Sequence, residues 1–326
     1  MTVVSATAEE GVSGAPHPRL TVVMTVFNGL PFLPDAVESV LAQTYRDFRL
    51  IVIDDGSTDG SGRYLDGVAD PRLVVVHQAN QGQHQAANRG IAMAEGELVA
   101  RMDADDVAQP DRLAKQVAFL DANPRVGLVG GQILRMGARG AGMPSNLPTS
   151  HAEIVDDLLA NRHGMCNATT MFRRKLFEQV GGYWEHDLSE DWDLFLRMAE
   201  VAELANLDEL LLAVRFHSGS LNGKRIVEAQ LYNEFAAHQA TLRAGGLPQV
   251  TFSEFLAGHR SRRWPGSWIF LLDCHAINQY RYAVANMYDG RRMAGLLHLG
   301  LSVLMAPRRT MHRGARTLTS RLRRRF

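Results

Sequence analysis

Three clusters of acidic side chains stand out in this chain of 326 residues, because each lies beside an apolar segment. They are found in the stretches IVIDDGSTDGS (51–61), LVARMDADD (98–106) and LSEDWDLFLRM (188–198). Carboxylates in such places can accept hydrogen bonds from a nucleoside, bind a divalent cation or take a proton from an attacking hydroxyl group. Each cluster also has a structural interpretation, in which the carboxylates only shape a turn or begin a helix.

The first cluster ends a predicted strand at Asp54 and Asp55, and Gly56 and Ser57 then allow a tight turn. A carboxylate at this place can accept an N–H group from a base or the hydroxyl groups of a ribose. The structural alternative is an Asx-turn that also caps the next helix.

The second cluster places Asp103, Asp105 and Asp106 within four positions. Three carboxylates repel one another, so the cluster costs stability unless a positive charge lies among them. Alternate residues of an extended stretch point the same way, so Asp103 and Asp105 can share one face. Their hard oxygen atoms suit Mg²⁺ or Mn²⁺ bound to a diphosphate. The alternative is a solvated acidic turn.

The third cluster favours a helix start, with Ser189 as N-cap and Glu190, Asp191 and Asp193 in the first turn. Acidic side chains there interact favourably with the helix dipole, which is a sufficient structural reason for them. In the chemical interpretation one of them is a general base, held by a rigid helix end. We expect Glu190 to raise the proton affinity of Asp191 by like-charge repulsion. The predicted buried face of the helix is Trp192, Phe195, Leu196 and Ala199.

The elements that must position these clusters alternate between strands and helices. Strands are predicted over 20–26, 48–53, 73–76, 98–102 and 126–129, and helices over 35–43, 85–94 and 112–120. Further along, the pattern predicts a loop over 137–148, strands over 166–172 and 210–216, helices over 173–179 and 191–200, and continuous helix from about 224. Such alternation implies right-handed crossovers and a mostly parallel sheet covered on both faces, with the chemistry beyond the carboxyl ends of the strands.

Other motifs were tested against the sequence. No G-x-G-x-x-G follows a strand, which disfavours a dinucleotide-binding dehydrogenase. The stretch GSLNGK (219–224) is one residue short of a phosphate loop, and Arg225 stands where that loop needs Ser or Thr. The chain has no G-x-S-x-G elbow and no H-E-x-x-H motif, and its histidines lack zinc spacing.

Charge is unevenly distributed, although the formal net charge is zero. Residues 291–326 contain no Asp, Glu or Lys but ten arginines, at positions 291, 292, 308, 309, 313, 316, 321, 323, 324 and 325. The apolar run 294–306 is too short to span a bilayer, so we weigh peripheral membrane binding against a packed helix with a solvated tail. Nucleic acid is not expected as a partner, because only Phe326 offers a stacking ring in the tail.

The cysteines and the N-terminal residues indicate the cellular compartment in which the protein is expected. Cys166 and Cys274 form neither a CxxC pair nor a disulfide framework, which favours a reducing compartment. The first 18 residues lack the basic start and apolar stretch of a signal peptide, and we expect a disordered tail there. The predicted location is the cytoplasm, with peripheral contact to the inner face of the plasma membrane as an extension.

Four stretches together resemble the bacterial family 2 glycosyltransferases, which are inverting enzymes of the GT-A fold. They are 22–61, 88–124, 181–200 and 214–222. The resemblance implies an α/β fold with a Rossmann-like, mostly parallel sheet and helices on both faces. It implies a GT-A domain over 19–222, after the tail 1–18, and a helical extension with a basic tail over 223–326.

The resemblance also implies roles for individual residues. Thr25, Phe27 and Asp55 are expected to line the nucleobase pocket, and donor binding is expected to involve Asn28, Asp54, Asp103 and Ala104 as well. Asp103 and Asp105 match the family's D-x-D motif and, with His217 of the R-x-H segment, are expected to approach a bound Mn²⁺ or Mg²⁺. Asp191 matches the position of the catalytic base.

One position departs from the family pattern, since Ala87 stands where an Arg is common. A diphosphate contact is then expected from His84, Gln85 or Arg89, or is missing. Acceptor pockets in this fold come largely from the second half of the domain, and the candidate acceptor contacts are Asn167, Tyr183, Trp184 and His186.

The resulting prediction is transfer of a sugar from a UDP- or dTDP-sugar to a hydroxyl group, with inversion, in cell-surface polysaccharide synthesis. The expected acceptor is a glycan or lipid-linked glycan. Two alternatives stay open. A nucleotidyltransferase usually needs a Gly-rich basic loop after the first strand, where residues 27–31 read FNGLP. A catalytically silent nucleotide-sugar-binding protein would not need Asp103, Asp105 and Asp191 together.

Overall fold

The computed structural model describes residues 17–136, 142–184, 188–215, 225–260, 266–288 and 290–307. Three predictions therefore fall wholly or largely outside the described residues: the disordered N-terminal tail, the roles of His186 and His217, and the behaviour of the basic tail.

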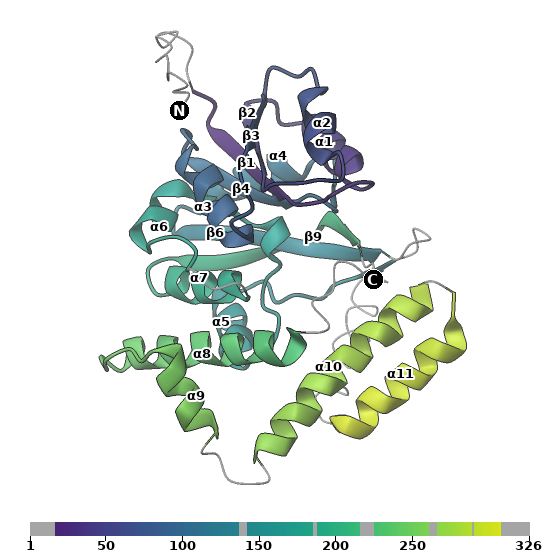
Figure 1. Ribbon diagram of the computed structural model, residues 1–326. Coiled ribbons are helices and arrows are strands. Elements are labelled where there is room, and N and C mark those ends of the chain that lie inside the picture. The colour runs from purple at the N-terminus through teal and green to yellow at the C-terminus, as the bar shows by residue number, and fades with distance from the viewer. Residues whose placement is uncertain are drawn as a thin grey trace, which may run out of the picture.

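Four parallel strands form the first half of the sheet, in the order β3 (Leu73–His77), β2 (Phe48–Asp54), β1 (Leu20–Val26) and β4 (Leu98–Asp103). In the register of these strands Val26 lies beside Asp54, and Thr25 lies beside Asp103. The carboxyl ends of β1, β2 and β4 therefore meet at one edge of the sheet (Figure 1), where the first two acidic clusters lie on either side of the end of β1.

The second half of the sheet is mixed. Strand β8 (Met171–Arg173) lies antiparallel between β4 and β6 (Val126–Met136), and β6 runs parallel to β9 (Glu203–Arg215). Two short antiparallel strands, β5 (Val107–Ala108) on β9 and β7 (Gly142–Pro144) on β6, complete it. The predicted α/β architecture, with a mostly parallel Rossmann-like sheet, is confirmed.

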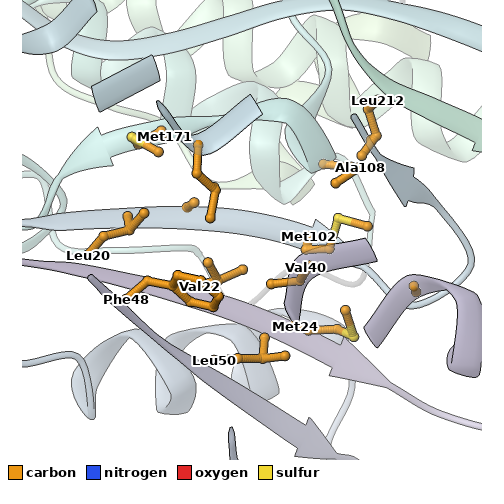
Figure 2. Packing of buried hydrophobic residues seen from close by; sticks show 14 of the residues in the cluster. Leu20, Val22, Met24, Val40, Phe48, Leu50, Met102, Ala108, Met171 and Leu212 are labelled. Carbon is orange, nitrogen blue, oxygen red and sulfur yellow. The ribbon is translucent and has the colours of Figure 1, made fainter. Parts of the chain in front are cut away.

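Helices cover both faces of this sheet. They are α1 (Leu33–Leu41), α2 (Ser61–Asp66), α3 (Gln83–Ala92), α4 (Arg112–Ala122), α5 (His151–Leu159), α6 (Arg174–Gln179) and α7 (Glu190–Ala199). Val22 and Met24 of β1 belong to the buried cluster that packs on α1 and α4 (Figure 2), whereas Val23 belongs to the cluster with α3 and α7. Alternate residues of a strand point to opposite faces, so β1 is buried from both sides.

The C-terminal part is helical, as predicted. It consists of α8 (Ile226–Ala244), α9 (Phe252–Arg260), α10 (Gly266–Tyr288) and α11 (Arg292–Met305). Ala236 and Ala240 of α8 join the cluster that contains α7, and α10 and α11 lie side by side as a hairpin (Figure 1). None of the described helices combines the length and the hydropathy that crossing a bilayer requires.

Two local predictions were wrong. Residues 166–172 do not form a continuous strand, because a 3₁₀ turn (Asn167–Thr169) precedes β8. The hydroxyls of Thr169 and Thr170 donate to the carbonyls of Cys166 and Asn167, each at 2.8 Å, and such side-chain bonds favour a turn. The predicted loop over 137–148 contains β7. The sequence analysis also left out β5, α2 and α5.

Candidate active site

Asp54, at the end of β2, braces the turn that follows it. Its Oδ1 accepts from the backbone N–H of Ser57 at 3.0 Å, and its Oδ2 lies 2.9 Å from Nδ1 of His77. Burial raises the pKa of Asp54, but the hydrogen bonds from Ser57 and His77 outweigh it and leave the pKa below its ordinary value. The described contacts of this carboxylate are therefore structural, as in an Asx-turn.

Asp55 organises the loop that leads into α3. It is 3% exposed, and its oxygens accept from the side-chain amide of Gln78 at 2.7 Å and from the backbone N–H groups of Gln81 and Gly82, both at 2.9 Å. Gly82 has a φ of 91°, which favours glycine, and it begins the helix. Asp55 thus fixes one wall beside the carboxyl end of β2.

The loop after β1 is bound directly to the turn after β2. Asn28 donates its backbone N–H to the hydroxyl of Ser57 at 2.9 Å, and its side-chain oxygen accepts from the backbone N–H of Thr58 at 2.8 Å. Phe27 directly before it is 54% exposed. An aromatic ring held on a fixed loop and open to solvent can stack on a flat ligand such as a nucleobase.

The three carboxylates after β4 differ in how deeply they are buried. Asp106 is 2% exposed, and its Oδ1 accepts from the backbone N–H of Arg215 at 3.1 Å, which ties the turn to β9. Asp103 is half-buried; burial and the charge of Asp105 raise its pKa, and the charges of Arg101 and Arg112 oppose this. Asp106 thus has a structural role, whereas the side chains of Asp103 and Asp105 remain partly accessible to solvent.

The first turn of α7 reaches the same site. Burial and the charge of Asp103 raise the pKa of Asp191 to about 6. Burial, with the charges of Asp191 and then Asp103, raises the pKa of Glu190 to about 7. Asp103 therefore adds to the like-charge repulsion between Glu190 and Asp191 that the sequence predicted.

The other acid and the expected cap of α7 have structural roles. Asp193 is buried and pairs with Nε of Arg197 at 2.6 Å, on the core side of the helix. Ser189 does occupy the N-cap position, but its hydroxyl donates to the carbonyl of Ala229 at 3.2 Å and does not cap the helix. The predicted side-chain cap is therefore wrong. The first turn of α7 is instead fixed by its packing on α8.

Two buried cations that the sequence analysis missed lie beneath the carboxylates. Arg101 is fully buried in β4 and donates to the carbonyl of Val23 at 2.9 Å, while its Nε and Nη2 make no well-aligned hydrogen bond with any described residue. Its charge lowers the pKa of Asp103, Glu190 and Asp191. The signal in the sequence was a basic residue inside an apolar strand, directly before an acidic cluster.

Arg112 is the second cation. It is 1% exposed and donates to the carbonyl of Arg101 at 2.7 Å, and burial lowers its pKa to about 10. Together the two arginines supply the positive charge that a cluster of three aspartates needs.

The donor set for a metal is incomplete within the residues that the structure describes. No group of three or more His, Cys, Asp and Glu side chains is arranged there as a metal site. Asp103 and Asp105 offer hard carboxylate oxygens, which suit Mg²⁺ or Mn²⁺, and the third expected ligand, His217, lies outside this part of the chain. These two carboxylates fit a cation that takes further ligands from a bound diphosphate.

Residues 21–181 match the sequence model of the family described as Glycosyl transferase family 2. One relative is EpsE of Bacillus subtilis (strain 168), which is named as a glycosyltransferase. It is 31% identical to this chain over 237 residues, and the aligned part covers 69% of this chain and 83% of EpsE. The chain belongs to glycosyl transferase family 2. Another relative is the amylovoran biosynthesis glycosyltransferase AmsE of Erwinia amylovora, 28% identical over 200 residues, which cover 59% of this chain and 74% of AmsE.

Solved structures show the same fold as this family 2 glycosyltransferase. S. aureus TarS 1–349 in complex with UDP-GlcNAc aligns with a TM-score of 0.54 and 18% identity, over 92% of this chain and 88% of the TarS 1–349 chain. The mannosyltransferase PcManGT of Pyrobaculum calidifontis, in complex with GDP-Man and Mn²⁺, aligns with a TM-score of 0.51 and 18% identity, over 90% of each chain. The fold is therefore GT-A.

The expected acceptor contacts of the glycosyltransferase are mostly packed against protein. The hydroxyl of Tyr183 donates to Oδ1 of Asn167 at 3.0 Å, and the Tyr183 ring lies 6.0 Å from the guanidinium of Arg101. Trp184 is half-buried, with the Arg197 guanidinium 5.3 Å from its ring. Tyr183 and Trp184 thus form part of the wall behind the carboxylates.

His84 and Arg89 were expected to replace the diphosphate contact of the family's Arg. His84 is 5% exposed, and the guanidinium of Arg89 donates to Oε1 of Gln78 at 2.8 Å. Ala87 itself is 2% exposed and lies in the core beside Val23. Through Gln78, Arg89 is linked to Asp55 and so to the loop before α3.

Proposed function

We propose that this glycosyltransferase transfers a sugar from a UDP- or dTDP-sugar to a hydroxyl group with inversion, using Asp191 as the general base. The observation that carries the proposal is the convergence of Asp103 and Asp191. These residues come from different elements, yet the charge of one raises the pKa of the other. This interaction supports a donor site and a proton acceptor that lie close to each other.

The donor is proposed to lie along the carboxyl ends of β1, β2 and β4. Phe27 would stack on the nucleobase, Thr25 and Asp55 would line its pocket, and Asn28, Asp54 and Ala104 would shape the loops around it. Support comes from the exposed ring of Phe27 and the fixed loops on either side. The solved complexes of TarS with UDP-GlcNAc and PcManGT with GDP-Man support a nucleotide-sugar donor.

Asp103 and Asp105, with His217, are proposed to hold Mn²⁺ or Mg²⁺. When bound, such a cation neutralises the negative charge that grows on the leaving diphosphate. The carboxylate chemistry of the pair and the Mn²⁺ in the PcManGT complex support this assignment. The positive charges of Arg101 and Arg112 favour the ionised form of Asp103.

Asp191 would take the proton of the acceptor hydroxyl as its oxygen attacks the anomeric carbon from the face opposite the diphosphate. A base with a pKa of about 6 is deprotonated at neutral pH and is still basic enough to assist, which is worth about 10²–10⁴ in rate. The acceptor is proposed to be a glycan or lipid-linked glycan of a cell-surface polysaccharide, as the name of AmsE suggests. The free thiols of Cys166 and Cys274 support the expected cytoplasmic setting.

A thermal-shift panel of UDP-, dTDP- and GDP-sugars, with Mn²⁺ or Mg²⁺, tests donor binding, because a ligand that binds only the native state raises the melting temperature. A donor-hydrolysis assay then separates an enzyme from a silent nucleotide-sugar-binding protein. NMR of the product's anomeric proton tests inversion. Retention of configuration would remove the base assignment, and lack of any stabilisation by nucleotide sugars would remove the donor site.

A further inference from the structure

Helix α11 carries apolar side chains on its solvent-facing side. Met293 and Leu304 are each 80% exposed, and Leu297 is 64% exposed. The exposed apolar positions are Met293, Leu296, Leu297, Gly300, Val303 and Leu304, which we call the apolar stripe. Their spacing of three and four residues places them on one side of the helix, where surface helices normally carry polar residues.

The opposite side of α11 is fixed against α10 by small and polar residues. The buried hydroxyl of Ser302 donates to the carbonyl of Ala276 at 2.9 Å, and Nδ1 of His298 lies 2.6 Å from Oε1 of Gln279. Gly295 is buried as well, and a Cβ there would come within 2.6 Å of Cγ of Met287. Rotating the apolar stripe inward would break these contacts, so the stripe is held toward solvent.

The start of α10 also exposes apolar side chains, close in the fold to the end of α11. The contacts of Ser302 with Ala276 and of His298 with Gln279 make the two helices antiparallel, so the end of α11 lies beside the first turns of α10 (Figure 1). These turns also expose apolar side chains, namely Trp268 (60%), Ile269 (55%), Leu271 (38%) and Leu272 (42%). An exposed patch of this kind normally marks a binding surface.

The charged residues around the apolar stripe indicate which kind of partner binds to it. Arg291 and Arg292 stand at the start of the stripe, eight more arginines follow from residue 308, and no Asp or Glu occurs between residues 290 and 326. Apolar side chains flanked by cations match the acyl boundary and the anionic headgroups of a bilayer. A second copy bound through the same face would bring two sets of these arginines together, which like-charge repulsion disfavours.

We propose that the α10–α11 hairpin docks the apolar stripe on an anionic lipid bilayer. Docking would hold the catalytic domain at the membrane surface independently of what the active site transfers. The contribution of each exposed leucine comes from burial of its side chain at the boundary, and that of the arginines comes from the surface potential.

Flotation of the purified full-length chain with lipid vesicles tests the proposal. We expect binding to vesicles that contain phosphatidylglycerol and little binding to pure phosphatidylcholine. The double variant Leu297→Glu/Leu304→Glu should partition at least about tenfold less, because it exchanges two inserting side chains for anions. Val201→Glu, a 50% exposed position after α7, is the matched control and should float like the wild type.

Both leucines are exposed, so the double variant should keep the melting temperature and donor hydrolysis of the wild type. Absence of flotation with the anionic vesicles would overturn the proposal, and so would equal flotation of the double variant. A dimer in analytical ultracentrifugation that the double variant abolishes would assign the stripe to a second copy instead.

Discussion

Asp103 at the end of β4 raises the pKa of Asp191 at the start of α7, so two carboxylates from distant parts of the chain share one site. Strand β8 and the preceding 3₁₀ turn lie between these two stretches in the sequence. The sheet brings β4 next to β8, and the cluster that contains Phe172 of β8 also contains Trp192 and Phe195 of α7. Asp103 and Asp191 are thus brought close to each other by the buried packing between α7 and the sheet.

Replacing Asp191 with Asn should lower the transfer rate by about 10²–10⁴, because it removes the proposed acceptor of the hydroxyl proton. Donor affinity should stay near that of the wild type, since the nucleotide contacts are elsewhere. Steady-state transfer rates and donor titrations measure the two effects. Glu190→Gln is the matched control and should retain most activity; full activity of Asp191→Asn would exclude it as the base.

Transfer should also decline at acid pH. The base must be deprotonated, and burial with the nearby charge of Asp103 raises the pKa of Asp191 to about 6. Protonation of Asp191 as the pH falls through about 6 therefore removes activity, and raising the pH restores it. A profile of kcat/KM against pH measures this acid limb. An activity that is constant down to pH 5 would contradict the proposed base.

The charge of Arg101 should determine the pH at which kcat/KM declines on the acid side of the profile. Its positive charge lowers the pKa of both Asp191 and Glu190, so Arg101→Met should raise both values and shift the limb to higher pH. Arg101→Lys keeps the charge and should restore part of the shift. A merely structural role would lower the melting temperature of both variants without moving the profile. The pH profile of each variant, taken below its melting temperature, separates these outcomes.

Asp105→Ala should weaken metal-dependent donor binding, because it removes one of the two carboxylates that fit a divalent cation. The measurement is donor affinity by calorimetry, with Mn²⁺ present and after its removal by chelation. Asp111→Ala removes a nearby surface carboxylate, paired with Lys115 at 2.9 Å, and is the control. If the affinity and its dependence on Mn²⁺ were unchanged in Asp105→Ala, this residue would not be a metal ligand.

Much of the framework could be predicted from the sequence, because apolar runs and acidic clusters report where parallel strands end. The predicted strand at residues 20–26 coincides with β1, and Asp55 and Asp103 follow or end the two strands that flank β1, at the same edge of the sheet, as the alternation requires. Arg101 and the hydrogen bonds of Asp55 could not be predicted. They depend on which distant groups face each other once the chain has folded, and periodicity carries no such information.

The interaction between the side chains of His77 and Asp54 should make the free energy of unfolding depend on pH. The hydrogen bonds that the His77 ring donates to Asp54 and then to Asp66 raise the pKa of His77 above 6.5. The stabilisation that this interaction provides is complete below pH 6.5 and is lost as the pH rises through the higher value. The pKa of Asp54 lies below 3.8, so its stabilisation is present above that pH and is lost in stronger acid.

The advantage of the wild type over His77→Gln should therefore be largest between about pH 4 and 6.5 and should shrink toward pH 9. It should amount to about 1 kcal/mol or less, because the His77 side chain is 46% exposed and solvent screens the pair. Chemical unfolding at several pH values measures the difference. His17→Gln, which removes the surface partner of Glu95, is the control. An advantage that grew with pH would show that the charged form of His77 does not stabilise the fold.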